Sequence, residues 1–174
     1  TTTINGWFGN GIVVDGAGFL LNNEMDDFSS KPGVPNAYGL VGNISNAIEP
    51  RKRMLSSMSP SIVEKSNGEL FLVIGSPGGS TIITTTAQII MNVIDFNMSI
   101  ENAVESPRFH HQWLPDAIQM EIHGFSAETI NALENRGHNV KFRNSIGEAN
   151  CIQLFNGLLY GAADSRRNSK ASGY

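Results

Sequence analysis

The sequence predicts an α+β protein in which helices are layered on a largely antiparallel sheet. Strand-like apolar runs occur before, between and after segments with helical periodicity. Two of these runs turn at Asp-Gly or Asn-Gly pairs, which are typical of antiparallel hairpins. The 174 residues are 40% hydrophobic and 16% charged, as expected for a chain that buries a core of its own. We therefore expect a single domain over residues 1–174.

The N-terminal third predicts a hairpin followed by a long loop. Asp15-Gly16 separates two apolar runs, and Gly16 and Gly18 can adopt the positive φ that such a turn needs. Residues 28–55 have no clear periodicity and are rich in Pro, Gly, Asn and Ser. Because a stretch of that length in a compact domain is usually functional, we expect a lid or an active-site loop over 28–55.

The middle of the chain predicts a second hairpin and a helix. The hairpin turns at Asn67-Gly68, and its second arm, residues 70–74, is a continuous apolar run that suits a strand buried on both faces. Residues 81–96 have helical periodicity. The apolar face that we expect for this helix contains Ile83, Ala87, Ile90, Met91 and Ile94.

The C-terminal half predicts two short helices and three strands. The first helix covers residues 99–106 and ends before Pro107. The second has Ser126 as its N-cap and Gly137 just after its end. We expect the strands over 139–143, 149–155 and 158–164.

Composition excludes several classes of partner. A net charge of −4 gives no basic surface for nucleic acid, and no apolar run approaches the ~20 residues that cross a membrane. The single Cys151 excludes an internal disulfide. His110 and His111 are adjacent and lack the spacing of a metal motif, so we interpret them as structural and expect neither a metal nor a cofactor.

The sequence "GSPGGS" at residues 75–80 lies between the buried strand and the helix. Adjacent Gly78 and Gly79 can direct backbone N–H groups into a cavity near a helix N-terminus, where negative charge is favoured. Such a bend suits a phosphate or the oxyanion of an acyl-transfer intermediate. It is not a Walker A loop, since no Lys follows the glycines. A tight turn is the alternative interpretation.

Two polar clusters could also bind a ligand. The run "LLNNEMDDF" places five polar residues directly after an apolar strand: Asn22, Asn23, Glu24, Asp26 and Asp27. Its acidic residues could bind an ammonium group, bind a metal or face water. Ser56 and Ser57 follow basic residues and could bind a carboxylate. Each cluster is weak evidence by itself.

Taken in order, these motifs resemble the small, C-terminal subunit of the γ-glutamyltransferases, also called glutathione hydrolases. The matching stretches are "FLLNNEMDDFSSKPGVPNAYGLVG", "SSMSPSIV", "GSPGGSTIITT", "PRFHHQWLPD" and "LYGAADSR". The resemblance implies a four-layer αββα sandwich of the N-terminal nucleophile hydrolase type. It also implies a precursor that cleaves itself, a periplasmic or secreted location, and a γ-glutamyl substrate such as glutathione. The large subunit of the same precursor is the implied partner.

The resemblance also bears on the first residue. A chain that begins "TTTING" could use Thr1 as an N-terminal nucleophile. In the family, however, this stretch matches the second strand of a hairpin whose first strand begins with the nucleophile. We therefore expect Thr1 not to be the nucleophile, and the chain alone to be inactive. A second strand without its partner is a sheet edge, through which we expect self-association.

The family's site residues carry over position by position. Thr3 matches the residue that orients the nucleophile, and Tyr38 lies in the lid segment. The α-amino group of the substrate is implied to bind Asn5, Glu24 and Asp27, its α-carboxylate Ser56 and Ser57, and the oxyanion Gly78 and Gly79. Thr81 stands where the family commonly has an arginine. Two alternatives stay open: a non-catalytic fragment or inactive relative that binds glutamate, and a phosphate ligand at residues 75–80.

Overall fold

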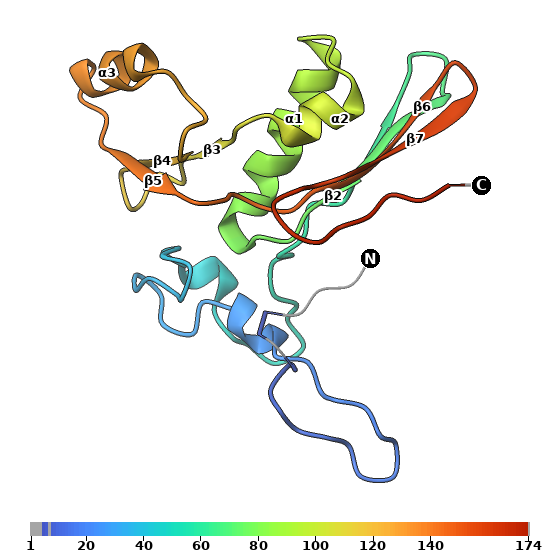
Figure 1. The fold of residues 1–174 in the computed structure, drawn as a ribbon. Coiled ribbons are helices and arrows are strands. Elements are labelled where there is room, and N and C mark those ends of the chain that lie inside the picture. Colours follow the sequence, from blue (N-terminus) through green and yellow to red (C-terminus); the bar gives the residue numbers. More distant parts are fainter. Residues whose placement is uncertain (1–4, 7, 174) are drawn as a thin grey trace. The chain divides into compact units, whose positions relative to one another are not determined.

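The computed structural model describes residues 5, 6 and 8–173 (Figure 1). The chain forms two compact units, Thr1–Met58 and Ser59–Tyr174. Each is described by itself below, and the single domain stays a prediction.

The first unit consists of turns and two short 3-10 helices, η1 (Glu24–Asp27) and η2 (Ile44–Asn46). The expected hairpin at Asp15-Gly16 is present, but it is held by a single antiparallel bridge between Val13 and Leu20 and not by regular strands. Gly16 and Gly18 have φ values of 75° and 71°, as the turn was expected to need.

The loop over residues 28–55 is closed at its base. A parallel bridge joins Ser29 to Ala47, and the Ser29 N–H donates to the carbonyl of Asn46 at 2.9 Å. Further along, Gly33 N–H donates to the carbonyl of Gly42 at 2.8 Å. The stretch therefore folds back on itself through backbone hydrogen bonds although it lacks a periodic sequence.

The second unit is built on a four-stranded antiparallel sheet. Its strands are β1 (Ser61–Glu64), β2 (Leu70–Gly75), β6 (Asn150–Phe155) and β7 (Leu158–Ala163), in the order β1-β2-β6-β7. The expected hairpin at Asn67-Gly68 is confirmed, as are the expected strands over 149–155 and 158–164. Helices α1 (Ile82–Ile94) and α2 (Ile100–Glu105) pack on this sheet (Figure 1). The core between them contains Leu72, Ile74, Ile89, Val93, Ile100, Ala103, Val104, Ala149, Cys151 and Ala162.

Two expectations about this core are wrong. Strand β2 buries only one face, because Leu72 and Ile74 point toward the helices while Val73 is 38% exposed. Helix α1 packs through a face other than the expected one, since Ile83 is 68% exposed and Met91 49%. Its buried side chains are Ile82, Thr85, Thr86, Ile89 and Val93.

A smaller sheet of three strands completes the second unit. It contains β3 (Phe109–His110), β4 (Ile118–Glu121) and β5 (Val140–Arg143) in the order β3-β4-β5. Helix α3 (Ala127–Asn135) connects β4 to β5, which run parallel. Ser126 caps α3 by accepting from Thr129 N–H at 3.1 Å, and Gly137 has φ 90°, both as expected. Strands β3 and β4 were not expected. The α+β class with largely antiparallel sheets is confirmed.

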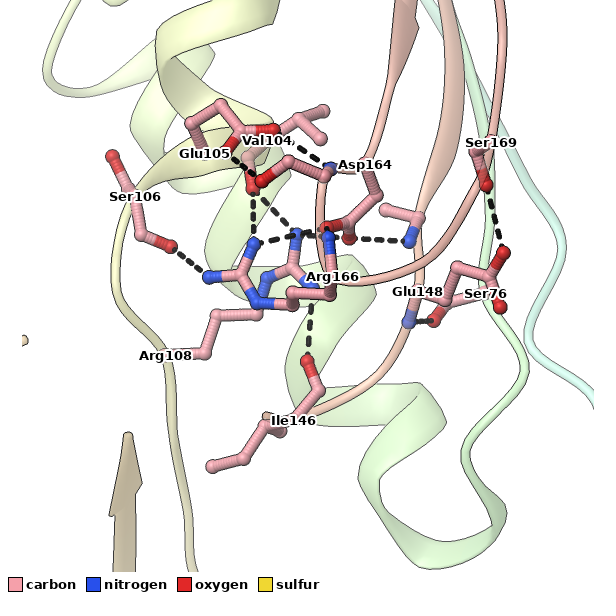
Figure 2. A network of polar contacts seen from close by, with 12 residues as sticks. Ser76, Val104, Glu105, Ser106, Arg108, Ile146, Glu148, Asp164, Arg166 and Ser169 are labelled. Atoms are coloured by element: carbon pink, nitrogen blue, oxygen red, sulfur yellow. Dashed lines mark hydrogen bonds and ion pairs between the residues drawn. The ribbon is translucent and has the colours of Figure 1, made fainter. Parts of the chain in front are cut away.

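A buried network of charges joins these elements (Figure 2). Arg108 is 1% exposed and contacts Asp164 at 2.8 Å. Arg166 donates from Nε and Nη2 to the two carboxylate oxygens of Glu121, each at 2.6 Å. Burial acts to raise the pKa of Asp164 and of Glu121, but hydrogen bonds from backbone N–H groups and the arginines outweigh it, so both pKa values are lowered. Both carboxyl groups are therefore ionised at neutral pH.

Two further observations complete the fold. Burial raises the pKa of Cys151 to about 12, so its thiol is protonated at neutral pH. Among the helices of the described residues, none has the length and apolar character to cross a bilayer.

Candidate active site

The first cluster of expected site residues forms around Asn5. Helix η1 has three residues per turn, so Glu24 and Asp27 lie above one another on one side of it. The side-chain Nδ2 of Asn5 donates to Asp27 Oδ1 at 2.8 Å, and the Asn5 N–H donates to Glu24 Oε1 at 3.1 Å. The structure thus brings together the three residues expected to bind an α-amino group.

Glu24 in this cluster lacks a partner for one of its oxygens. The residue is 8% exposed, and its buried Oε2 accepts no hydrogen bond within the described part of the chain. Burial raises the pKa of Glu24, and the neighbouring Asp27 raises it further, while the Asn5 N–H partly offsets both. A cation with N–H donors would satisfy Oε2 and favour the ionised form.

Two asparagines support the cluster: Asn23, which the sequence placed in the polar run after the strand, and Asn46, which it did not single out. Asn23 Oδ1 accepts from the Asn5 N–H at 3.0 Å. Asn46 donates from Nδ2 to the carbonyl of Asp27 at 2.7 Å and accepts from the Leu55 N–H at 3.1 Å. Asn46 therefore connects the end of η1 to the residue before the serine pair. Asn is typical of such loop contacts, but nothing in the sequence pairs residues 19 positions apart.

A cavity of about 320 Å³ lies beside Asn5 and Tyr38. Tyr38 Oη donates to the carbonyl of Asn5 at 3.3 Å, so the loop over residues 28–55 reaches the cluster through this side chain. Asn5 is thus shared between the carboxyl cluster and the cavity, whereas Glu24 and Asp27 do not line it. The lining residues are Asn5, Gly6, Asn23, Asp26, Ser30, Asn36, Ala37 and Tyr38.

The serine pair is only partly engaged. Ser56 Oγ accepts from the Met58 N–H at 3.2 Å and forms a local turn. Ser57 Oγ is buried and has no hydrogen-bond partner among residues 5, 6 and 8–173. A buried hydroxyl without a partner is unfavourable, so an acceptor atom of a ligand that took the proton of Ser57 Oγ would relieve this cost. Within the described residues, neither serine contacts Glu24 or Asp27.

The diglycine bend belongs to the second unit. Gly78 has φ 140° and Gly79 has φ 57°, both in the region that favours glycine. Gly79 begins the short helix η3 (Gly79–Thr81), which leads directly into α1. The first N–H groups of such a helix have no partner within it and are available to an anion.

The other residues of interest are the N-terminal threonines and the adjacent histidines. Thr1 and Thr3 lie outside the described residues. His110 is buried, with Nδ1 2.8 Å from Thr84 Oγ1 and Nε2 2.8 Å from Gln112 Oε1, which fits a structural histidine. The described residues contain no group of three or more His, Cys, Asp or Glu side chains arranged to hold a metal ion.

Several known proteins are similar to this chain in sequence and in fold. The glutathione hydrolase proenzyme of Escherichia coli is 53% identical over 167 residues, which cover 95% of this chain and 28% of that protein. The structure resembles a mutant of Helicobacter pylori gamma-glutamyltranspeptidase, with a TM-score of 0.90 at 54% identity over 96% of this chain and 91% of that one. It also resembles gamma-glutamyltranspeptidase from Pseudomonas nitroreducens complexed with L-DON, with a TM-score of 0.89 at 46% identity. That match covers 100% of this chain and 91% of the other.

The extent of these matches defines what they establish. The chain spans less than a third of the length of the first curated relatives, namely 28%, 31% and 30%. The family model of gamma-glutamyltranspeptidase, by contrast, matches residues 1–174. With its whole length matched, the chain belongs to the gamma-glutamyltranspeptidase family.

Proposed function

We propose that this chain serves γ-glutamyl transfer or hydrolysis, with glutathione and related γ-glutamyl compounds as substrates. In this reaction the hydroxyl of an N-terminal threonine attacks the γ-carbonyl, the amide C–N bond breaks, and the amine leaves with a proton, which gives the acyl-enzyme. Water or an acceptor amine then takes the glutamyl group and releases the threonine hydroxyl. The proposal rests mainly on one observation: the buried Glu24 Oε2 has no hydrogen-bond partner within the described residues. The carboxylate of Asp27 lies beside Glu24, and a hydrogen bond from Asn5 holds it in place.

The ammonium group of a glutamyl substrate fits that cluster. An ammonium has three N–H donors and is most stable between carboxylates. Glu24 Oε2 supplies one free acceptor, and Asp27 supplies a second carboxylate that Asn5 orients at 2.8 Å. Ser56 and Ser57 are proposed to bind the α-carboxylate, because the unpartnered Ser57 hydroxyl can donate to it.

The other roles follow from the same proposal. Gly78 and Gly79 supply N–H donors for the oxyanion that develops on the γ-carbonyl oxygen. Tyr38 covers the bound substrate as part of a lid over residues 28–55, in keeping with its hydrogen bond to Asn5. Thr3 orients the nucleophile.

The setting of the reaction is part of the proposal. The large subunit of the same precursor completes the enzyme, in a periplasmic or secreted location.

An assay of the assembled enzyme tests the proposal. Hydrolysis of γ-glutamyl-p-nitroanilide is measured for the wild type, for Asp27→Asn and for Asp15→Asn, a matched control at the exposed hairpin turn. Loss of a charge-assisted hydrogen bond of about 2 kcal/mol should raise KM about 30-fold in Asp27→Asn. Asp15→Asn should match the wild type. An Asp27→Asn variant with wild-type KM, or a wild type that binds glutamate without turnover, would contradict the proposal.

A further inference from the structure

Two hydroxyl groups hold the two carbonyl groups of the diglycine bend. Ser76 Oγ donates to the carbonyl of Pro77 at 2.7 Å. Thr81 Oγ1 donates to the carbonyl of Gly78 at 2.9 Å, and the Thr81 N–H donates to the same oxygen at 3.1 Å. The Pro77 carbonyl shares a peptide group with the Gly78 N–H, and the Gly78 carbonyl shares one with the Gly79 N–H.

This arrangement determines where the two N–H groups point. Both peptide groups are trans, and in a planar trans peptide the C=O and N–H bonds point in opposite directions. The Pro77 carbonyl points toward Ser76, so the Gly78 N–H points away from Ser76. The Gly78 carbonyl points toward Thr81, so the Gly79 N–H points away from Thr81. Within the described residues, neither N–H donates a hydrogen bond, so both remain available.

The hydroxyl of Ser76 is itself fixed by the turn before β6. The Glu148 N–H donates to Ser76 Oγ at 3.0 Å, as Figure 2 shows. A hydroxyl has one proton to donate, and with this N–H on its acceptor side Ser76 gives that proton to the Pro77 carbonyl. Glu148 in turn accepts from Ser169 Oγ at 2.7 Å. A Cβ on Gly147 would lie 2.9 Å from Ser76 Oγ, so the turn also packs closely against this side chain.

The hydroxyl of Thr81 is fixed by burial. Thr81 is 2% exposed, and its Oγ1 would lie 2.5 Å from a Cβ on Gly78. Position 78 therefore needs glycine both for its φ of 140° and for the close approach of this hydroxyl. The same hydroxyl thus packs against Gly78 while it donates to the Gly78 carbonyl.

We propose that Ser76 and Thr81 are positioning residues for the oxyanion hole, each setting the direction of one N–H donor. This inference rests on the proposed function of Gly78 and Gly79. Donors that are fixed in advance stabilise the tetrahedral intermediate without reorganisation. Since negative charge is absent from the carbonyl oxygen of the bound substrate and develops only in the transition state and the tetrahedral intermediate, loss of either hydroxyl should lower kcat and leave substrate binding nearly unchanged.

The test compares Ser76→Ala and Thr81→Val with two controls in the assembled enzyme. Thr81→Ser keeps the hydroxyl, and Ser80→Ala removes a neighbouring hydroxyl that makes no hydrogen bond within the described residues. With γ-glutamyl-p-nitroanilide, each test variant should lose about 10-fold in kcat, as expected for a donor that is misdirected but present. KM and the inhibition constant of L-glutamate should stay within about twofold. Affinity for a γ-boronic acid analogue of glutamate, a mimic of the tetrahedral adduct, should fall in parallel with kcat.

Other outcomes separate this inference from the proposed function. If the wild type is active and both test variants keep kcat within twofold, the positioning role is wrong and the proposed function stands. A loss of kcat matched by an equal loss of glutamate binding indicates a merely structural role, as does a Thr81→Ser variant no better than Thr81→Val. If Thr81→Val does not fold, Ser76→Ala with its glutamate inhibition constant still decides the question. A wild type without turnover overturns both proposals together.

Discussion

Two buried glutamates of this chain differ in the sign of their pKa shifts. Glu121 accepts from Arg166 twice at 2.6 Å and from the Arg108 N–H at 2.9 Å, so donors outweigh the cost of burial and lower its pKa. Burial and the neighbouring carboxyl group of Asp27 raise the pKa of Glu24, and the single backbone N–H from Asn5 offsets them only in part. Glu121 is thus satisfied by the protein, whereas Glu24 has no donor for one buried oxygen among the residues that the structure describes.

The raised pKa of Glu24 predicts that glutamate binding depends on pH. Glu24 in the free protein keeps its proton above the ordinary value of 4.5. An ammonium ligand favours the ionised form, so binding releases that proton and affinity should increase as pH rises through the raised pKa. Calorimetry on the assembled enzyme between pH 4 and 8, in buffers of different ionisation heat, measures both the affinity and the proton release.

Glu24→Gln serves as the control for that experiment. The variant keeps the shape of the side chain but has no carboxyl group to titrate. Proton release on binding between pH 4 and 8 should therefore disappear, and the affinity for glutamate should fall. Equal pH profiles for the wild type and Glu24→Gln would show that Glu24 does not titrate on binding.

Short elements decide the geometry of the site, and sequence patterns identify such elements poorly. The 3-10 helix η1 aligns Glu24 with Asp27, yet a four-residue element has no periodicity to detect. Helix α1 shows the opposite problem, because apolar residues occur on both of its sides. Its buried face includes Thr85 and Thr86, whose small side chains allow close packing, while the more apolar Ile83 faces outward. Hydrophobicity alone therefore selected the wrong face.

At the base of the loop over 28–55, Gly42 lies too close to Ser29 to accept a larger side chain. A Cβ there would lie 2.2 Å from Ser29 Oγ and 2.7 Å from Ser29 Cβ. Gly42→Ala should therefore force the base apart and destabilise the first unit by about 1–3 kcal/mol. Hydrogen exchange followed by mass spectrometry should show faster exchange over residues 28–55. The matched control is Ile44→Ala in the same loop, since Ile44 is 74% exposed and its truncation should change exchange little. Unchanged exchange in Gly42→Ala would mean that this contact does not hold the loop closed.

At the scale of the whole chain, the sequence predicted the hairpins, the three helices and the late strands, because each has a local signal. Contacts between distant residues were not predicted. Arg108 pairs with Asp164 and Arg166 with Glu121, across 56 and 45 positions, and no periodicity relates them. Strand β4 was missed because its four residues precede a crossover to a parallel partner, which has no turn motif. The family motifs supplied the site residues and the polar run already included Asn23, but only the structure brought Asn46 into the cluster.

The buried charge network predicts that the second unit is sensitive to acid. Glu121 and Asp164 have lowered pKa values in the folded state, so their stabilisation is present above their ordinary values of 4.5 and 3.8. It is lost as pH falls below those values toward the folded pKa, because the unfolded chain then binds more protons. Asp164→Asn leaves Arg108 buried without its ionic partner and should cost about 3–5 kcal/mol at pH 7.

Urea unfolding at pH 7, 5 and 3 measures this effect, and far-UV circular dichroism reports on the second unit because α1, α2 and α3 all belong to it. The cost of Asp164→Asn should shrink as pH falls below 3.8, because the unfolded wild-type chain then binds a proton at position 164 and the ionised pair contributes less to stability. Asp95→Asn, an exposed control after α1, should differ from the wild type by no more than about 0.5 kcal/mol at any pH. A cost of Asp164→Asn that stays constant from pH 7 to pH 3 would show that its role is packing and not charge. A cost that shrinks would show that the ionised pair of Arg108 and Asp164 holds together elements that lie far apart in the sequence.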